Sequence, residues 1–192
     1  MCLSHRSRTV FLNSVNNAGI TSPKTLEQID EAFFDDLFNL NVKSPLFLTK
    51  AAVNHMAPGA CHRMHMTSWS DPPRVGSRII FFSSSLTSAT GVLPNSLVYI
   101  GSKGAVEQFT RALSKDLASK GITVNCVSPG ATDTAMFRAG KSDTVIKHIA
   151  DQNPFHRLGS VDDIKGIVAF LAGPEAGWVS GQNIRVNGAF CV

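Results

Sequence analysis

The chain lacks the features that mark secreted, membrane-spanning or nucleic-acid-binding proteins. Its 192 residues include four cysteines without paired spacing, which argues against a disulfide framework or a zinc ribbon and favours a reducing, cytoplasmic setting. No stretch approaches the ~18 apolar residues of a membrane span, and the N-terminal apolar run is too short for a signal peptide, so we expect a soluble protein. The net charge of +4 comes from 18 basic and 14 acidic residues without a long basic run, so no nucleic-acid partner is expected.

Apolar runs and helical periodicity alternate along the chain. They predict strands over residues 10–15, 78–82, 122–127 and 183–186, and helices over residues 26–52, 98–119 and 161–171. Strands that alternate with helices predict an α/β fold with a doubly wound parallel sheet. The length and the ordinary globular composition suit one domain over residues 1–192.

Two features are expected to shape the loops and the first helix. The polar turn after the first strand ends in Gly19, which is free to take a positive φ. Pro45 lies inside the first predicted helix, where it lacks an N–H and its ring clashes with the carbonyl of Asn41. We therefore expect a kink that leaves this carbonyl free.

Residues 57–77 break the pattern, because they have no apolar period and are longer than most connections. We interpret this segment as an irregular insertion. Cys61, His62 and His65 lie inside it, but their spacing matches no established metal site, so no metal is expected.

The chain's only tyrosine, Tyr99, is followed by Lys103, and the i, i+4 spacing places both on one face of the second predicted helix. A phenol becomes an acid-base group near neutral pH only if a cation stabilises its phenolate, and a lysine one turn away does this. The pattern is common, and a helix-start tyrosine with a solvated lysine is the alternative. Ser84 or Ser85, at the end of a predicted parallel strand, is placed to reach the same substrate oxygen.

These residues occur in an order that resembles the short-chain dehydrogenase/reductase family. The motifs that carry the resemblance are Asn16-Asn17-Ala18-Gly19, Asn41, Tyr99-x-x-x-Lys103, Pro129-Gly130, Pro154 to Gly159, and Val186-Asn187-Gly188. The resemblance covers residues 10–192 apart from the insertion. It implies a Rossmann-type fold and an NAD(P)-dependent oxidoreductase that transfers a hydride between nicotinamide and a small-molecule ketone or secondary alcohol.

The resemblance implies a role for each active-site residue. Tyr99 would be the acid/base, and Lys103 would lower its pKa and bind the nicotinamide ribose. Ser84 would polarise the carbonyl, with Ser85 as the alternative. Asn41 would hold a water through its main-chain carbonyl and extend a proton relay to Lys103.

The resemblance also implies a cofactor cleft for NADP or NAD. Its residues would be Asn17, Ala18, Gly19, Tyr99, Lys103, Pro129, Gly130, Thr132 and Thr134. The alternatives are a polar turn that ties neighbouring strands and a plain strand-terminating turn. The two long helices would form a homo-oligomer interface, as they do in the family.

The chain departs from the family pattern at its start. No glycine precedes Gly19, so the glycine-rich loop that holds a dinucleotide and the first strands of the sheet are missing. We therefore expect an incomplete Rossmann-type domain whose first strand is an exposed edge. The competing hypothesis is a catalytically inactive fragment, from a truncated or wrongly predicted gene product, that serves at most as an interaction module.

Overall fold

A four-stranded parallel sheet forms the centre of the protein. The structure is a computed structural model that describes residues 13–56 and 76–192. The sheet has the order β1-β2-β3-β4, with β1 over Asn13–Asn16, β2 over Arg78–Phe82, β3 over Thr123–Pro129 and β4 over Asn183–Val186. All neighbouring pairs are parallel, and β1 pairs with β2 from Asn13↔Arg78 to Asn16↔Phe81. The predicted α/β class and parallel sheet are confirmed.

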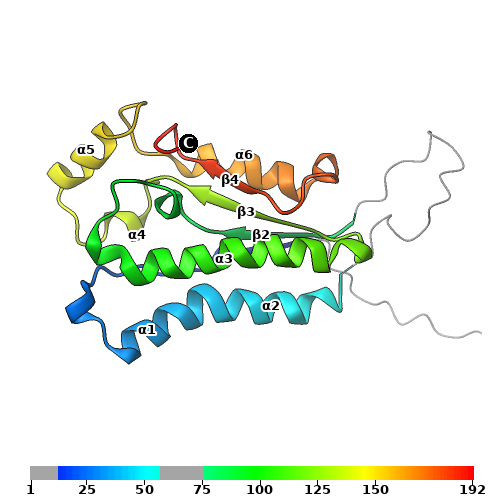
Figure 1. Cartoon of the computed structure of the whole chain (residues 1–192). Coiled ribbons are helices and arrows are strands. Elements are labelled where there is room, and N and C mark those ends of the chain that lie inside the picture. The colour runs from blue at the N-terminus through cyan, green and yellow to red at the C-terminus, as the bar shows by residue number, and fades with distance from the viewer. Residues whose placement is uncertain (1–12, 57–75) are drawn as a thin grey trace, which may run out of the picture.

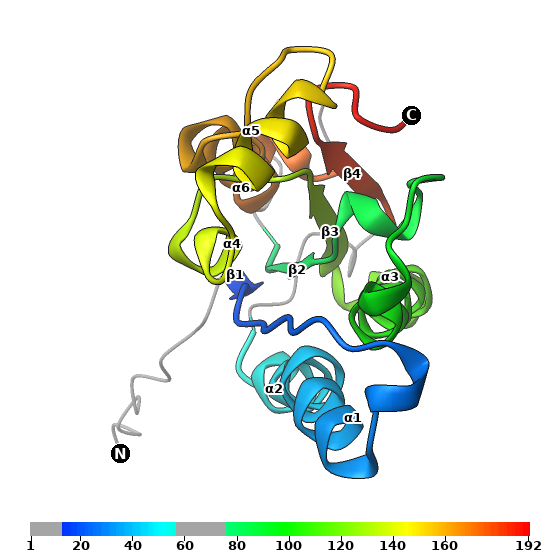
Figure 2. The ribbon, with the colours of Figure 1, turned by 90° about the vertical axis from the view of Figure 1, so that its left-hand side faces the viewer.

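Helices cover both faces of this sheet. They are α1 (Glu31–Phe38), α2 (Ser44–Val53), α3 (Leu97–Asp116), α4 (Ala135–Arg138), α5 (Asp143–Asp151) and α6 (Val161–Ala172). The first three lie on one face and α6 lies on the other, while α4 and α5 lie toward the carboxyl ends of the strands (Figures 1 and 2). No helix within residues 13–56 and 76–192 is long and apolar enough to cross a membrane.

The core has two layers because alternate side chains of each strand point to opposite faces. In β2, Ile79 and Phe81 pack with the residues of α2 and α3, whereas Ile80 packs toward α6. All three side chains are at most 1% exposed. An apolar side chain at almost every position of β2 is therefore the sequence signature of a strand that is covered on both faces.

The first helical region differs from the single kinked helix expected over residues 26–52. A short 3-10 turn covers Leu26–Gln28, and α1 begins only after Asp30, whose side chain accepts a hydrogen bond from the Phe33 N–H at 2.7 Å. Between α1 and α2 the chain makes a π-helical turn over Asn39–Lys43. The helix widens rather than breaks, because Pro45 falls in the first turn of α2, where its missing N–H costs little.

Two predictions fall partly or wholly outside the described residues. The strand expected over residues 10–15 is seen from Asn13 onward, and its first three residues are not described. Most of the expected insertion, residues 57–75, also lies outside the described residues, as do Cys61, His62 and His65. The insertion and the single-domain assignment stay predictions.

Candidate active site

The residues predicted to carry chemistry lie where the strands end and α3 begins. Tyr99 and Lys103 are one turn apart on α3, and the Lys103 Nζ lies 5.8 Å from the centre of the Tyr99 ring. Ser84 lies two residues after the end of β2, and its hydroxyl is near enough to the Tyr99 phenol to lower the pKa of that phenol. The phenol, the amine and a serine hydroxyl therefore converge, as the i, i+4 spacing and the strand end predicted.

Only one of the two candidate serines reaches the tyrosine. Ser84 Oγ accepts a hydrogen bond from the Leu86 N–H at 3.3 Å, which leaves its own proton available to the phenol. Ser85 is 1% exposed, and its Oγ donates to the Ser128 main-chain oxygen at 2.9 Å. The structure thus brings Ser84 to Tyr99 and turns Ser85 into the sheet.

Lys103 and Asn41 are both fixed by hydrogen bonds. The buried Lys103 ammonium donates to the Phe82 main-chain oxygen at 2.8 Å. The Asn41 side chain, 2% exposed, accepts from the Ile20 N–H and donates to the Ile20 carbonyl, both at 2.9 Å, and it also contacts Ser102 Oγ at 3.1 Å. Asn41 therefore ties the loop after β1 to α3.

The two pKa shifts at this site have the same cause. Burial raises the pKa of the Tyr99 phenol, and the nearby Ser84 hydroxyl opposes this only in part. Burial also lowers the pKa of Lys103. Lys103 is not among the causes of the shift at Tyr99, and its ammonium is directed at the Phe82 carbonyl. The expected effect of Lys103 on the pKa of Tyr99 stays a prediction. A raised pKa favours the protonated form of the phenol.

The loop after β1 packs closely against the lysine. Gly19 is not among the glycines with positive φ, so the conformational role expected for it is wrong. A Cβ at this position would lie 3.3 Å from both Asn41 Oδ1 and Lys103 Nζ, which is a tight contact. Glycine therefore lets the loop approach the ammonium, and the neighbouring Asn17 and Ala18 are exposed. Exposed main chain beside an ammonium donor suits the nicotinamide-ribose end of a dinucleotide.

The candidate residues after β3 have structural contacts of their own. Thr132 Oγ1 donates to the Gly130 carbonyl at 3.0 Å, and Thr134 Oγ1 caps α4 by accepting from the Phe137 N–H at 3.2 Å. Pro129 ends β3 beside β4. A Cβ on Gly130 would lie 3.0 Å from Asn187, so this glycine allows close approach of the two strand ends.

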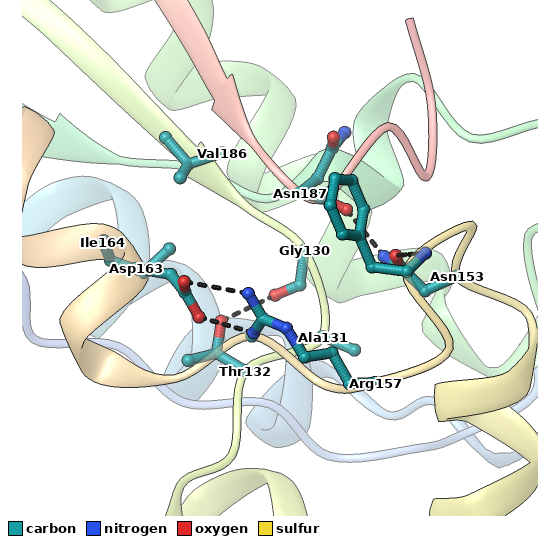
Figure 3. Close-up of a pocket in the computed structure, with 12 residues that line it drawn as sticks. Gly130, Ala131, Thr132, Asn153, Arg157, Asp163, Ile164, Val186 and Asn187 are labelled. Atoms are coloured by element: carbon teal, nitrogen blue, oxygen red, sulfur yellow. Dashed lines mark hydrogen bonds and ion pairs between the residues drawn. The ribbon is translucent and has the colours of Figure 1, made fainter.

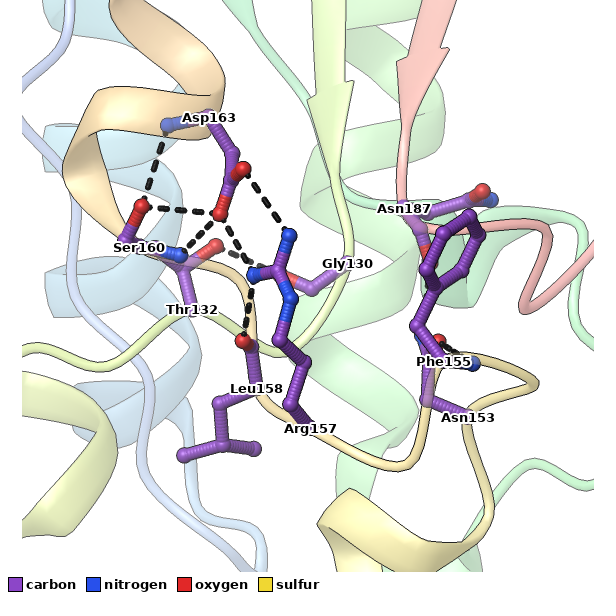
Figure 4. A network of polar contacts seen from close by, with 9 residues as sticks. All are labelled: Gly130, Thr132, Asn153, Phe155, Arg157, Leu158, Ser160, Asp163 and Asn187. Atoms are coloured by element: carbon purple, nitrogen blue, oxygen red, sulfur yellow. Dashed lines mark hydrogen bonds and ion pairs between the residues drawn. The ribbon is translucent and has the colours of Figure 1, made fainter.

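A cavity of about 200 Å³ lies beside this segment (Figure 3). Gly130 and Thr132 line it, together with residues from the end of β4 and the start of α6. Arg157 and Asp163 form a bidentate ion pair at its rim, with N–O distances of 2.7 and 3.0 Å (Figure 4). The guanidinium is thus already engaged by a carboxylate and is not a free anion-binding group.

Sequence reasoning missed one polar side chain next to the site. Glu107, on α3, contacts the hydroxyls of Ser83, one residue before Ser84, and Thr87, three residues after it. The only signal was the i, i+4 relation to Lys103, which is too common to single it out. Among the described residues, no group of three or more His, Cys, Asp or Glu side chains could hold a metal.

Comparison with known proteins decides the family. A family model described as enoyl-(acyl carrier protein) reductase matches residues 13–190. A short-chain type dehydrogenase/reductase from Picea abies is 40% identical over 176 residues, which are 91% of this chain and 59% of that protein. The chain belongs to the short-chain dehydrogenase/reductase family.

Other members of the short-chain dehydrogenase/reductase family are similar in sequence or structure. An NADPH-dependent aldehyde reductase-like chloroplastic protein from Arabidopsis thaliana is 38% identical, over 92% of this chain and 60% of that protein. The solved structure of an angucycline C-6 ketoreductase with bound NADP superposes with a TM-score of 0.79 at 31% identity, covering 94% of this chain and 63% of that one. The chain therefore spans about 60% of the length of the curated relatives it matches.

Proposed function

We propose that this chain carries the carbonyl-reducing half of an NADP-dependent oxidoreductase site, with a ketone or aldehyde as substrate. The observation that carries the proposal is the convergence of three groups: the Ser84 hydroxyl acts on the Tyr99 phenol, and the Lys103 Nζ lies 5.8 Å from the centre of the Tyr99 ring, one turn away on the same helix. The relatives named as NADPH-dependent aldehyde reductases, and the ketoreductase with NADP bound, support this cofactor and substrate class.

Bound NADPH supplies the hydride that reduces the carbonyl carbon. Tyr99 donates its phenolic proton to the carbonyl oxygen, on which negative charge develops. Ser84 donates a hydrogen bond to the same oxygen and stabilises that charge. A phenol whose pKa is raised by burial is protonated at neutral pH, which suits an acid in the reducing direction.

Lys103 and Asn41 have supporting roles beside Tyr99. Lys103 binds the nicotinamide ribose and restores the proton to Tyr99 after each turnover. Asn41 holds the loop that carries Gly19 against α3, and so fixes the position of this loop beside the ammonium. Asn17, Ala18 and Gly19 on one side, and Pro129, Gly130, Thr132 and Thr134 on the other, border the cofactor.

None of the described residues is assigned to the adenosine end of the cofactor. We also propose a homo-oligomer formed through the two helical regions on one face of the sheet, and a cytoplasmic location.

Titration with NADPH, followed by the fluorescence of the nicotinamide, tests the proposal. We expect saturable binding, and turnover of a ketone or aldehyde panel that Tyr99→Phe reduces by about 10²–10⁴-fold while the melting temperature changes little. Failure to saturate at millimolar NADPH would show that the isolated chain is a non-catalytic fragment. Retained turnover in Tyr99→Phe would overturn the role of the phenol.

A further inference from the structure

The Glu107 carboxylate contacts two residues, one before and one after Ser84 in the sequence. Ser83 Oγ lies 2.7 Å from Glu107 Oε1, and Thr87 Oγ1 lies 2.6 Å from the same oxygen. Thr87 Oγ1 is also 2.7 Å from the Ser84 main-chain oxygen. The segment that presents the Ser84 hydroxyl is therefore held before and after that residue.

The chemistry of these contacts makes them strong. Hydroxyl-to-carboxylate hydrogen bonds are short, about 2.5–2.7 Å, and are roughly twice as strong as neutral ones. Each hydroxyl has one proton, and the carboxylate is the best acceptor near either of them. Glu107 is partly buried, so water competes with these contacts only weakly.

Glu107 and Tyr99 lie on the same helix, α3. Glu107 lies one turn beyond Lys103 and two turns beyond Tyr99 on α3, a helix of 20 residues that packs on the sheet. Because the Glu107 carboxylate belongs to this helix, it holds residues 83–87 in a fixed position relative to Tyr99. Small shifts of that segment along β2 would otherwise change the separation between the Ser84 and Tyr99 hydroxyls.

We infer that Glu107 is a positioning residue, which acts on the proposed reaction only by holding the Ser84 hydroxyl against the Tyr99 phenol. The inference rests on the proposed function, since Ser84 and Tyr99 are its reacting groups. Glu107 touches neither substrate nor cofactor in this assignment.

A direct electrostatic role has the opposite signature. Removing a nearby negative charge would favour the phenolate and lower the pKa of Tyr99, whereas losing the hydrogen bond from Ser84 would raise it. The other ionisable groups here are Lys103, on the same helix, and Cys126, on β3. Burial and the Glu107 charge raise the pKa of the Cys126 thiol to about 12, so it stays neutral.

The single tyrosine makes a direct experiment possible. NMR of protein labelled with isotopically enriched tyrosine gives one pair of ring resonances, because Tyr99 is the only tyrosine. Their chemical shifts report the hydrogen bonding of the Tyr99 phenol in the folded chain without any cofactor. We expect Glu107→Ala to reproduce most of the chemical-shift change caused by Ser84→Ala, and to add little to it in the double variant. Glu107→Gln retains an acceptor oxygen and should keep the wild-type resonance, as should the control Gln108→Ala on the exposed side of α3.

A second variant covers the case in which Glu107→Ala does not fold. Ser83→Ala combined with Thr87→Val keeps the Glu107 charge but removes both donors, and it should shift the resonance as Ser84→Ala does. Titration of tyrosinate absorbance should then give a raised Tyr99 pKa. An unchanged resonance in the folded variants, additive shifts, or a lowered pKa in Glu107→Ala would overturn the inference. The measurement does not depend on NADPH binding, so a failure of the proposed function would not imitate any of these results.

Discussion

Two adjacent residues after β4 hold the left-handed backbone conformation, and only one of them is a glycine. Gly188 has φ +59° and Ala189 has φ +60°. An L-residue pays about 1–2 kcal/mol for this conformation, while glycine loses about 0.5–1 kcal/mol of extra chain entropy on folding. We therefore expect Ala189→Gly to raise the free energy of unfolding by a few tenths to about 1 kcal/mol.

The neighbouring substitution should have the opposite sign. A Cβ at Gly188 would lie 2.8 Å from Asn153 Oδ1, in a side chain that also donates to the Asn187 carbonyl at 2.7 Å. Gly188→Ala should cost about 1–2 kcal/mol, from the backbone conformation and the displaced amide. Denaturant unfolding of the two variants measures both changes in the free energy of unfolding. Changes of the same sign in Ala189→Gly and Gly188→Ala would contradict this account.

The choice between the two candidate serines shows what one sequence can decide at this scale. The motif order placed serines at the end of β2, and the helix spacing placed Tyr99 and Lys103 together, because both follow from backbone periodicity. Successive side chains at a strand end point in different directions, so Ser84 reaches Tyr99 while Ser85 bonds to the Ser128 carbonyl. Glu107 escaped notice because its partners, 24 and 20 residues away, are neighbours only in the folded chain.

The start of α6 depends on one carboxylate with several partners. Asp163 accepts from both guanidinium nitrogens of Arg157 and from the Ser160 N–H, the last at 2.7 Å, while Ser160 Oγ accepts from the Asp163 N–H at 3.1 Å (Figure 4). The Arg157 hydrogen bonds, and then those from Ser160, hold the pKa of Asp163 well below its usual range. The segment before α6, which lines the cavity beside Gly130, is thereby fastened to the helix.

A lowered carboxyl pKa gives a defined pH dependence. Its stabilising effect is fully present above the ordinary carboxyl pKa of about 4 and is lost as the pH falls toward the folded-state value. The Asp163→Asn variant should therefore have a lower free energy of unfolding than the wild type at neutral pH. This difference should disappear as the pH falls. Urea unfolding across this range is the measurement.

Asp162→Asn is the matched control for Asp163→Asn. The Asp162 carboxylate also lies in the first turn of α6, but it is 76% exposed and pairs only with Lys165, at 2.7 Å, in the ion pairs of the described chain. Exposed pairs of this kind contribute little. A pH-independent gap for Asp163→Asn, or an equal gap for both variants, would show that the Arg157 contacts do not stabilise the helix start.

The elements differ in how far the sequence could predict them. The strands β2 and β4 match the predicted ranges, and in β2 the reason is a nearly continuous apolar run, which is typical of a strand covered on both faces. The helix α5 was missed, although Ser142 caps it by accepting from the Val145 N–H, because its surroundings are polar and none of its residues is buried. The π-helical turn before α2 depends on how α1 and α2 pack, which a proline rule does not contain.

At the scale of the whole molecule, the described sheet has β1 as an edge strand. The strand β1 pairs with β2 on one side only, and no described strand covers its other edge. Val15 on this strand is 45% exposed, which is unusual for an apolar residue of a parallel sheet. The curated relatives are about half as long again as this chain, whereas the groups proposed for hydride and proton transfer already lie within residues 13–192.

A chimera tests whether the two halves of the site are separable. The part of the 40%-identical Picea abies relative that lies outside its match to this chain would be joined to the chain at the corresponding end. If it adds strands to the β1 edge and donors for the pyrophosphate, two charge-assisted hydrogen bonds of about 1.5–3 kcal/mol each would tighten NADPH binding by roughly 100-fold or more. Lys103→Ala should weaken binding in both the chimera and the chain by a similar factor, because it acts at the nicotinamide end. A chimera that binds no tighter than the 192-residue chain would mean that β1 does not accept the added strands, and the exposed edge would then need another explanation.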